Sequence, residues 1–261
     1  MGKDHIYRIG SQGGVTFVPD DGSKLFKFPM GLPGTRRRTE SEQCFAIERV
    51  IYDRLDNGCN HILQCFGTTE DRITLEFCEG GPLRGILRDS DSQYLSLEDR
   101  LRWALQVAEG LAFCHSKGIL HADLGCSNIF LTRQHDAKLG DFGGSSIDGS
   151  LALVCYSESH QLPDDPNQPS SDTSNGVQVS VKTEIFAFGS TLYEIMTGSE
   201  PYAGRSDITE LFQQGNFPDT GHLFLGRIMA KCWQTEYDSL NEVLEDLRAE
   251  GKIKDLILSR H

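Results

Sequence analysis

The chain has 261 residues, enough to bury a sizeable core as one large domain or as two lobes. It carries 38 acidic against 25 basic residues, a formal net charge of −13, which argues against a nucleic-acid or anionic-membrane partner. The sequence has no apolar run near the ~18 residues of a membrane span and no signal-peptide core, and its eight cysteines form no CxxC pair. We therefore expect an intracellular protein, most simply a cytoplasmic one, with free thiols.

The first part of the chain is rich in short apolar runs interrupted by glycine. This pattern predicts β-strands at VTFV, KLFKF and ITLEF. One helix is expected among them, over residues 41–55, beginning near Ser41 or Glu42. The basic run at 36–38 is interpreted as a solvated loop.

From residue 95 the pattern becomes helical. A helix is predicted over 95–118, with Ser96 and Asp99 at its start and Gly118 at its end. Residues 182–198 are apolar on almost every face and predict a buried helix, and shorter helices are expected in 206–215, 224–233 and 239–250. Residues 158–176 predict a long mobile loop. Strands followed by helices indicate an α+β architecture with two lobes.

Two short turns carry the most informative polar residues. HADLGCSN contains Asp123 and Asn128, and LGDFG contains Asp141. A cap or a turn hydrogen bond is the simpler interpretation of any one aspartate. Together, however, two short strands of a hairpin would bring Asn128 and Asp141 to the same end. Their oxygen atoms suit Mg²⁺, and Asp123 would be left to accept or orient a hydroxyl proton.

The two turns resemble the protein-kinase pattern H-R-D-L-x-x-x-N followed by D-F-G. Here the pattern stands as HADLGCSN, from His121, and as DFG, from Asp141. The resemblance covers the chain from about Arg8 to the last helix. Within the family, the chain is similar to compact fungal-type kinase-like domains. It implies one bilobal protein-kinase-like domain over 1–261. A small β-rich N-lobe with one main helix would take about 1–77, the hinge about 76–81 and a larger helical C-lobe about 82–261.

The same resemblance implies roles for individual residues. Lys27, preferred to Lys24, would form an ion pair with Glu48 that orients the phosphates of ATP. The implied catalytic residues are Asp123, Lys27 and Asn128, and the implied Mg²⁺ ligands are Asn128 and Asp141. The residues implied to bind ATP also include a degenerate glycine loop and the two sides of an adenine pocket: Gly10, Gly13, Val15, Leu25, Leu75, Glu76, Phe77, Cys78 and Phe130.

The sequence also departs from the family pattern. Gly125 stands where serine/threonine kinases carry a lysine, and Ser127 stands at the alternative arginine position of tyrosine kinases. Losing one such contact costs roughly 10²–10³ in rate, so low activity is expected. Ala122 replaces the arginine that binds an activation-segment phosphate. Glu184 replaces the aspartate of the central helix, but it is long enough to reach the 121–123 turn.

The A-P-E element is also missing. Asp164 in LPD is the nearest substitute, and the arginine that would pair with it is missing as well. Losing both partners of a buried pair can be nearly neutral.

These features favour an ATP- and Mg²⁺-dependent protein kinase that acts on a protein hydroxyl, with Ser/Thr preferred to Tyr. The alternative is a pseudokinase, serving as a nucleotide-binding or protein-interaction module, which Gly125 and the degenerate glycine loop favour. A small-molecule kinase fits less well, because FGSTLYEI and the CW region resemble protein kinases. The physiological substrate, the regulation and the oligomeric state do not follow from the sequence. Cys126 is interpreted as a small apolar filler.

Overall fold

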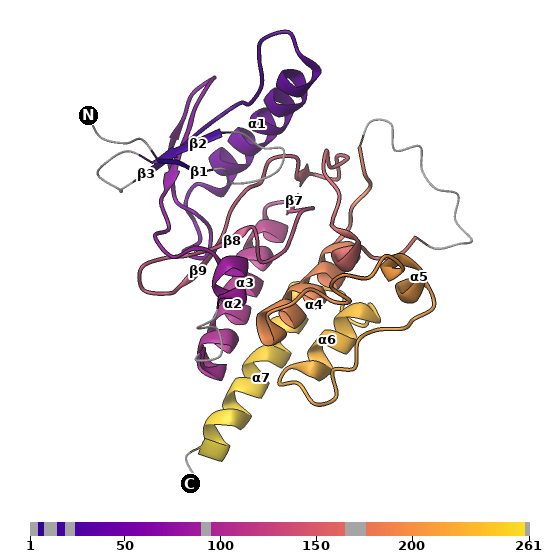
Figure 1. The fold of residues 1–261 in the computed structure, drawn as a ribbon. Coiled ribbons are helices and arrows are strands. Elements are labelled where there is room, and N and C mark those ends of the chain that lie inside the picture. Colours follow the sequence, from indigo (N-terminus) through magenta and orange to yellow (C-terminus); the bar gives the residue numbers. More distant parts are fainter. Residues whose placement is uncertain (1–4, 8–14, 19–23, 90–94, 165–175, 259–261) are drawn as a thin grey trace.

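The structure, a computed structural model, describes residues 5–7, 15–18, 24–89, 95–164 and 176–258 and has two lobes (Figure 1). The N-lobe holds an antiparallel five-stranded sheet of order β1-β2-β3-β5-β4, beside helix α1. The strands are β1 (His5–Tyr7), β2 (Val15–Val18), β3 (Lys24–Phe28), β4 (Cys65–Thr68) and β5 (Ile73–Glu76). The α+β, two-lobed fold expected from the sequence is confirmed.

Helix α1 (Arg36–Leu55) begins earlier than the sequence analysis predicted. The Thr35 side chain accepts a hydrogen bond from the backbone N–H of Arg38 and caps the helix. Pairs at i,i+4, Arg36 with Glu40 and Arg38 with Glu42, support the first turns. The basic run therefore forms the start of the helix, and its interpretation as a loop was wrong.

The C-lobe is built from helices, and the predicted ones are all present. They are α3 (Leu97–Ser116), α4 (Val181–Thr197), α5 (Ile208–Gln213), α6 (Gly226–Trp233) and α7 (Leu240–Leu258); the short α2 (Leu83–Arg88) was not predicted. The Ser96 hydroxyl caps α3 by accepting from the Asp99 N–H, and Gly118 follows the helix with a φ of 70°, in the left-handed region.

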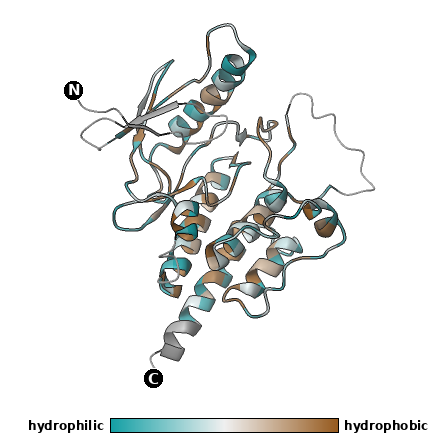
Figure 2. Cartoon of the chain, in the orientation of Figure 1, coloured by the Kyte–Doolittle hydropathy of each residue, from teal (hydrophilic) through white to brown (hydrophobic). Residues whose placement is uncertain are grey.

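Helix α4 lies at the centre of the C-lobe, between α3 and α6, while α7 packs on α3. Most of its side chains are buried, as the apolar pattern predicted. Figure 2 shows hydrophobic residues on the facing sides of these helices and hydrophilic residues on the outer end of α1. The core of the C-lobe therefore lies among α3, α4, α6 and α7, next to the residues at the junction of the lobes.

Short strands at this junction position the two polar turns. β8 (Ile129–Leu131) and β9 (Ala137–Leu139) form the expected hairpin, and β6 (Gly81–Pro82) pairs with β8. β7 (Ile119–Leu120) pairs with β10 (Ser146–Ile147) on the other side. As a result the 121–128 turn and the segment that starts at Asp141 lie beside one another.

The segment predicted as a loop over 158–176 is only partly covered. Residues 165–175 lie outside the described residues, whereas Glu158–His160 forms a 3₁₀ turn in which Ser159 and His160 are buried. The beginning of this segment is therefore structured, which corrects the prediction there.

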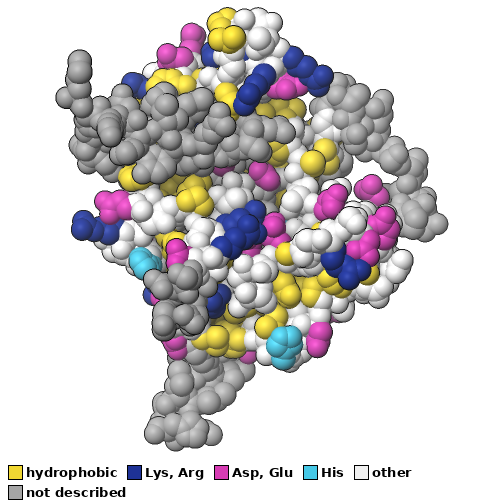
Figure 3. Space-filling view, in the orientation of Figure 1, with side chains coloured by type: hydrophobic (Ala, Val, Ile, Leu, Met, Phe, Trp, Pro, Cys, Tyr) yellow, Lys and Arg dark blue, Asp and Glu magenta, His cyan; other side chains and the backbone are white. Residues whose placement is uncertain are grey.

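Within the described residues, every helix is too short or too polar to cross a bilayer. Over the described surface visible in Figure 3, basic side chains stand in small separate groups with acidic ones beside them.

Candidate active site

Lys27 lies at the centre of a buried cluster of charges. Its Nζ is 2.6 Å from Glu48 Oε2 on α1 and 2.6 Å from Asp141 Oδ1 after β9. The side chains of Lys27 and Glu48 are only 3% and 0% exposed. The ion pair predicted between these two residues is thus present. The rival residue, Lys24, is exposed and lies over the ring of Phe66, because adjacent side chains of β3 point to opposite faces.

The charged groups of this cluster shift one another's pKa values. Burial disfavours the ammonium, but the carboxylates of Asp141 and Glu48 outweigh it and raise the pKa of Lys27. Burial also raises the pKa of Glu48, to about 7, against the attraction of Lys27. Lys27 therefore stays charged at neutral pH.

An apolar cavity opens beside Lys27, between the two lobes. Most of the residues that the sequence analysis expected to bind ATP line it, including Leu25, Leu75, Phe77, Cys78 and Phe130. It is also lined by Leu63, Glu79, Gly81 and Pro82, which the sequence analysis missed. Leu63 is positioned beside the cavity by a hydrogen bond from its backbone N–H to the carbonyl of Leu139. This contact joins distant segments of the chain, so no local sequence pattern indicates it.

Three expected residues of the glycine loop cannot be placed in the same way. Gly10 and Gly13 lie outside the described residues, and of Val15 the structure gives the backbone, at the start of β2 and paired with Phe28. Glu76 lines the cavity, but its N–H donates to the carbonyl of Gln64 and its carboxylate accepts from Lys138. That N–H is therefore not available to a ligand, and the carbonyl is the backbone polar group of Glu76 that remains for one.

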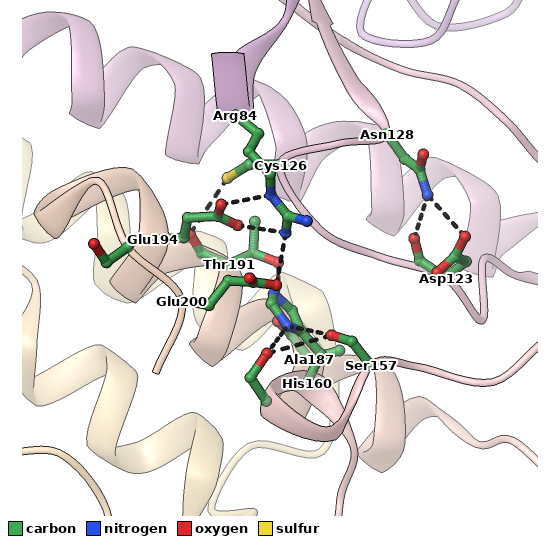
Figure 4. Close-up of polar contacts among 12 residues, drawn as sticks. Arg84, Asp123, Cys126, Asn128, Ser157, His160, Ala187, Thr191, Glu194 and Glu200 are labelled. Atoms are coloured by element: carbon green, nitrogen blue, oxygen red, sulfur yellow. Dashed lines mark hydrogen bonds and ion pairs between the residues drawn. The ribbon is translucent and has the colours of Figure 1, made fainter. Parts of the chain in front are cut away.

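The turn that carries Asp123 is fixed by an internal hydrogen-bond pair. Asn128 Nδ2 donates to the carbonyl oxygen of Asp123, at 2.7 Å, and to its Oδ2, at 3.0 Å (Figure 4). The amide oxygen of Asn128 is thereby turned away from Asp123. The N–H of Gly140 donates to the Asn128 carbonyl and ties this turn to Asp141.

Burial raises the pKa of Asp123, and the negative charge of Asp141 adds to the effect. The two aspartates, which the sequence analysis expected in one site, are therefore electrostatic neighbours, and Asp123 is the more basic for it.

Glu184, on α4, binds the backbone of the turn that carries Asp123. Its Oε1 accepts from the Ala122 N–H, at 3.1 Å, and from the Tyr156 hydroxyl, and its Oε2 lies 2.6 Å from His115 Nε2. These contacts outweigh complete burial and lower the pKa of Glu184. The expected reach of this longer side chain is confirmed, and it supports Ala122 in a left-handed conformation, at a φ of 64°.

Phe142 connects the two turns to helix α1. Its fully buried ring lies 5.5 Å from the ring of Tyr52, on α1, and 5.0 Å from that of His121. Because Tyr52 and Glu48 lie one turn apart, a shift of Phe142 would also move the partner of Lys27.

The remaining departures from the family pattern have simple structural outcomes. Asp164 is exposed, so it does not reproduce a buried ion pair. Cys126 is fully buried, and burial raises the pKa of its thiol well above the usual range, in agreement with a filler role. All eight cysteines are free.

Comparison with known proteins identifies the family. A family described as "Protein tyrosine and serine/threonine kinase" matches residues 35–245. The serine/threonine/tyrosine-protein kinase HT1 of Arabidopsis thaliana is 24% identical over 225 residues, which are 80% of this chain and 54% of HT1. The serine/threonine-protein kinase Nek9 of Xenopus laevis is 30% identical over 63% of this chain and 17% of Nek9.

The tyrosine-protein kinase Src64B of Drosophila melanogaster is 25% identical over 84% of this chain and 42% of Src64B. The chain thus spans about half the length of these relatives, or less. The match covers both lobes and includes Glu48, the 121–128 turn and Asp141. The chain belongs to the protein tyrosine and serine/threonine kinase family.

Proposed function

We propose that this chain is a single kinase domain over 1–261 that transfers the γ-phosphoryl group of ATP, with Mg²⁺, to a protein hydroxyl. The observation that carries the proposal is Lys27, held at 2.6 Å from both Glu48 and Asp141 beside an apolar cavity. Packing alone does not favour three buried charges, because desolvation opposes them. Their convergence from three separate segments is what phosphate binding requires.

The cavity provides the proposed binding site for ATP. The adenine would lie between Leu25 and Phe130 with Leu75 behind it, and its edge would meet the carbonyl of Glu76 and the backbone of residues 77–78. Lys27 would hold the phosphates.

The residues around Asp141 fit Mg²⁺. The amide nitrogen of Asn128 donates hydrogen bonds to Asp123, which leaves the amide oxygen of Asn128 to bind a cation. Asp141 would add a carboxylate oxygen as a second ligand. Such hard oxygen donors suit Mg²⁺, which when bound neutralises phosphate charge.

Asp123 is the proposed acceptor of the hydroxyl proton. Its raised pKa makes it a better base, and Asn128 fixes its orientation. As the acceptor oxygen bonds to the γ-phosphorus, the bond to the bridging oxygen of ADP breaks and the proton passes to Asp123. Serine or threonine is the proposed acceptor. The name of Nek9 carries serine/threonine, that of HT1 carries serine, threonine and tyrosine, and that of Src64B carries tyrosine.

Transfer of phosphate from γ-labelled ATP tests the proposal. The purified chain with Mg²⁺ should label itself or a generic acceptor protein on serine or threonine. Asp123→Asn should lower the rate about 10²–10⁴-fold with unchanged ATP affinity, whereas Asp207→Asn, at an exposed position, should not.

Two results would contradict it. ATP binding in a thermal-shift assay without any transfer would establish the pseudokinase, which the kinase names of the relatives do not support. Neither binding nor transfer would leave a protein-interaction module.

A further inference from the structure

The space beside Gly125 is bordered by two nitrogen-bearing side chains. A methyl group added at Gly125 would lie 3.4 Å from Arg84 Nη2 and 3.6 Å from His160 Nε2. Arg84 comes from α2 and His160 from the 3₁₀ turn after residue 157, so neither lies near Gly125 in the sequence. This is the position at which the family resemblance leads one to expect a lysine.

Arg84 is held rigidly against the catalytic turn. Its backbone N–H donates to the Cys126 carbonyl, at 2.9 Å. Its Nε and Nη2 bind the two oxygens of Glu194, at 2.7 and 2.9 Å, and Nη2 also binds Glu200. These bidentate hydrogen bonds to one carboxylate fix the orientation of the Arg84 guanidinium.

The remaining guanidinium nitrogen is directed to the reactive side of the turn. The bonds to Glu194 and Glu200 use Nε and Nη2, and in Figure 4 Nη1 points toward the side that carries Asp123 and Asn128. Arg84 also counts among the charges that lower the pKa of Asp123, so the two groups interact. Arg88 lies 3.7 and 3.2 Å from carboxylate oxygens of the same two glutamates, so the two arginines together balance the charge of Glu194 and Glu200.

His160 adds a second, independent indication of a missing partner. Its side chain is 1% exposed, and its Nδ1 lies 3.1 and 3.0 Å from the hydroxyls of Ser157 and Ser159. Among the described residues its Nε2 has no hydrogen-bond partner. When a serine hydroxyl donates to Nδ1, Nε2 carries the proton and is a buried donor that needs an acceptor. A buried donor without a partner in the described part of the chain, His160 Nε2, and a positively charged guanidinium therefore border one space, an arrangement that suits an anion.

We propose that Arg84 and His160 together bind the phosphoryl group during its transfer and replace the lysine that is absent at position 125. The inference rests on the proposed function and names two residues that it does not use. In the transfer step the hydroxyl proton still goes to Asp123 and the bond to ADP still breaks. Arg84 and His160 stabilise the negative charge on the equatorial oxygens and exchange no proton.

The experiment removes the charge of Arg84 without leaving Glu194 buried and unpaired. The variant Arg84→Gln/Glu194→Gln should lower kcat about 10²–10³-fold. Its affinity for ADP with Mg²⁺ and aluminium fluoride, an analogue of the transition state of phosphoryl transfer, should fall by a similar factor. Its affinity for ATP should stay within twofold. The matched control Arg205→Gln/Asp207→Asn removes an exposed arginine–carboxylate pair and should change neither value.

Two further variants test the position of the charge. Gly125→Lys, added to the Arg84→Gln/Glu194→Gln variant, should recover at least tenfold in both kcat and analogue affinity, because the vacated space accepts the lysine stem. His160→Asn, which keeps a polar atom near Nδ1 but removes Nε2, should lower analogue affinity about tenfold. His160→Gln, which keeps an N–H near Nε2, should lower it less.

The outcomes separate this inference from the proposed function. A wild-type chain that transfers phosphate, with an Arg84→Gln/Glu194→Gln variant within threefold in kcat and analogue affinity, overturns this inference alone. A rise only in KM for the acceptor would place Arg84 on the protein substrate and overturn it as well. A folded wild-type chain that transfers nothing overturns both.

Discussion

Replacement of Lys27 by methionine is the most direct test of the buried charge cluster. At the observed 2.6 Å, one Nζ–carboxylate pair is worth about 6 kcal/mol of attraction at an effective dielectric constant of about 20. Desolvation offsets much of this gain. Removing the ammonium leaves Glu48 and Asp141 as unpaired carboxylates that are 0% and 8% exposed. We therefore expect a loss of about 3–5 kcal/mol in the free energy of unfolding.

The loss should depend on pH. The raised pKa of Glu48, about 7 against an ordinary 4.5, means that the folded state binds more protons than the unfolded state between these values. The contribution of Glu48 to stability is thus present below about pH 4.5 and falls as pH rises to 7. Without Lys27 the pKa rises further, so the cost of Lys27→Met should be larger at pH 8 than at pH 5.

Urea unfolding of the nucleotide-free protein measures these effects, with Lys24→Met as the matched control on the same strand. Lys24 is exposed, so its replacement should cost less than about 1 kcal/mol. Adding Glu48→Leu to Lys27→Met should restore at least half of the loss, because the partner charge is removed too. Equal unfolding midpoints for Lys27→Met and Lys24→Met would refute the reasoning.

Three further substitutions probe other parts of the site. Burial lowers the pKa of His160 to about 4, so between pH 6.5 and 4 only the unfolded state binds this proton and the folded state loses stability. His160→Gln should remove about 3 kcal/mol of this acid-induced decrease in the free energy of unfolding, measured with urea. An unchanged pH dependence of the unfolding free energy would contradict this. Glu184→Gln should cost about 2 kcal/mol and lower kcat at constant ATP affinity, because the catalytic turn loses a charged acceptor; unchanged kcat would count against it. Gly140→Ala should cost about 1–3 kcal/mol and weaken ATP binding measured by calorimetry, since the added methyl presses on Leu63 and Phe130; unchanged affinity would refute it.

The sequence predicted well what depends on local pattern. The family resemblance preferred Lys27 to Lys24 within KLFKF, and the structure agrees, because Lys24 and Lys27 lie three residues apart on a strand and face opposite ways. Helical periodicity predicted α3 and α4 within a few residues. It failed at the first turn of α1, where exposed arginines carry no apolar period and capping by Thr35 decides the start.

By itself the sequence determined the two-lobed class and the turn residues Asp123, Asn128 and Asp141, since each depends on neighbours close in the chain. Only the tertiary structure decided what surrounds Gly125. Arg84 lies on a six-residue helix and finds Glu194 110 residues away, and His160 lies in a segment that reads as a loop. Ion pairs between distant segments leave no periodic signal in the chain, because long-range packing and not local conformation brings their partners together.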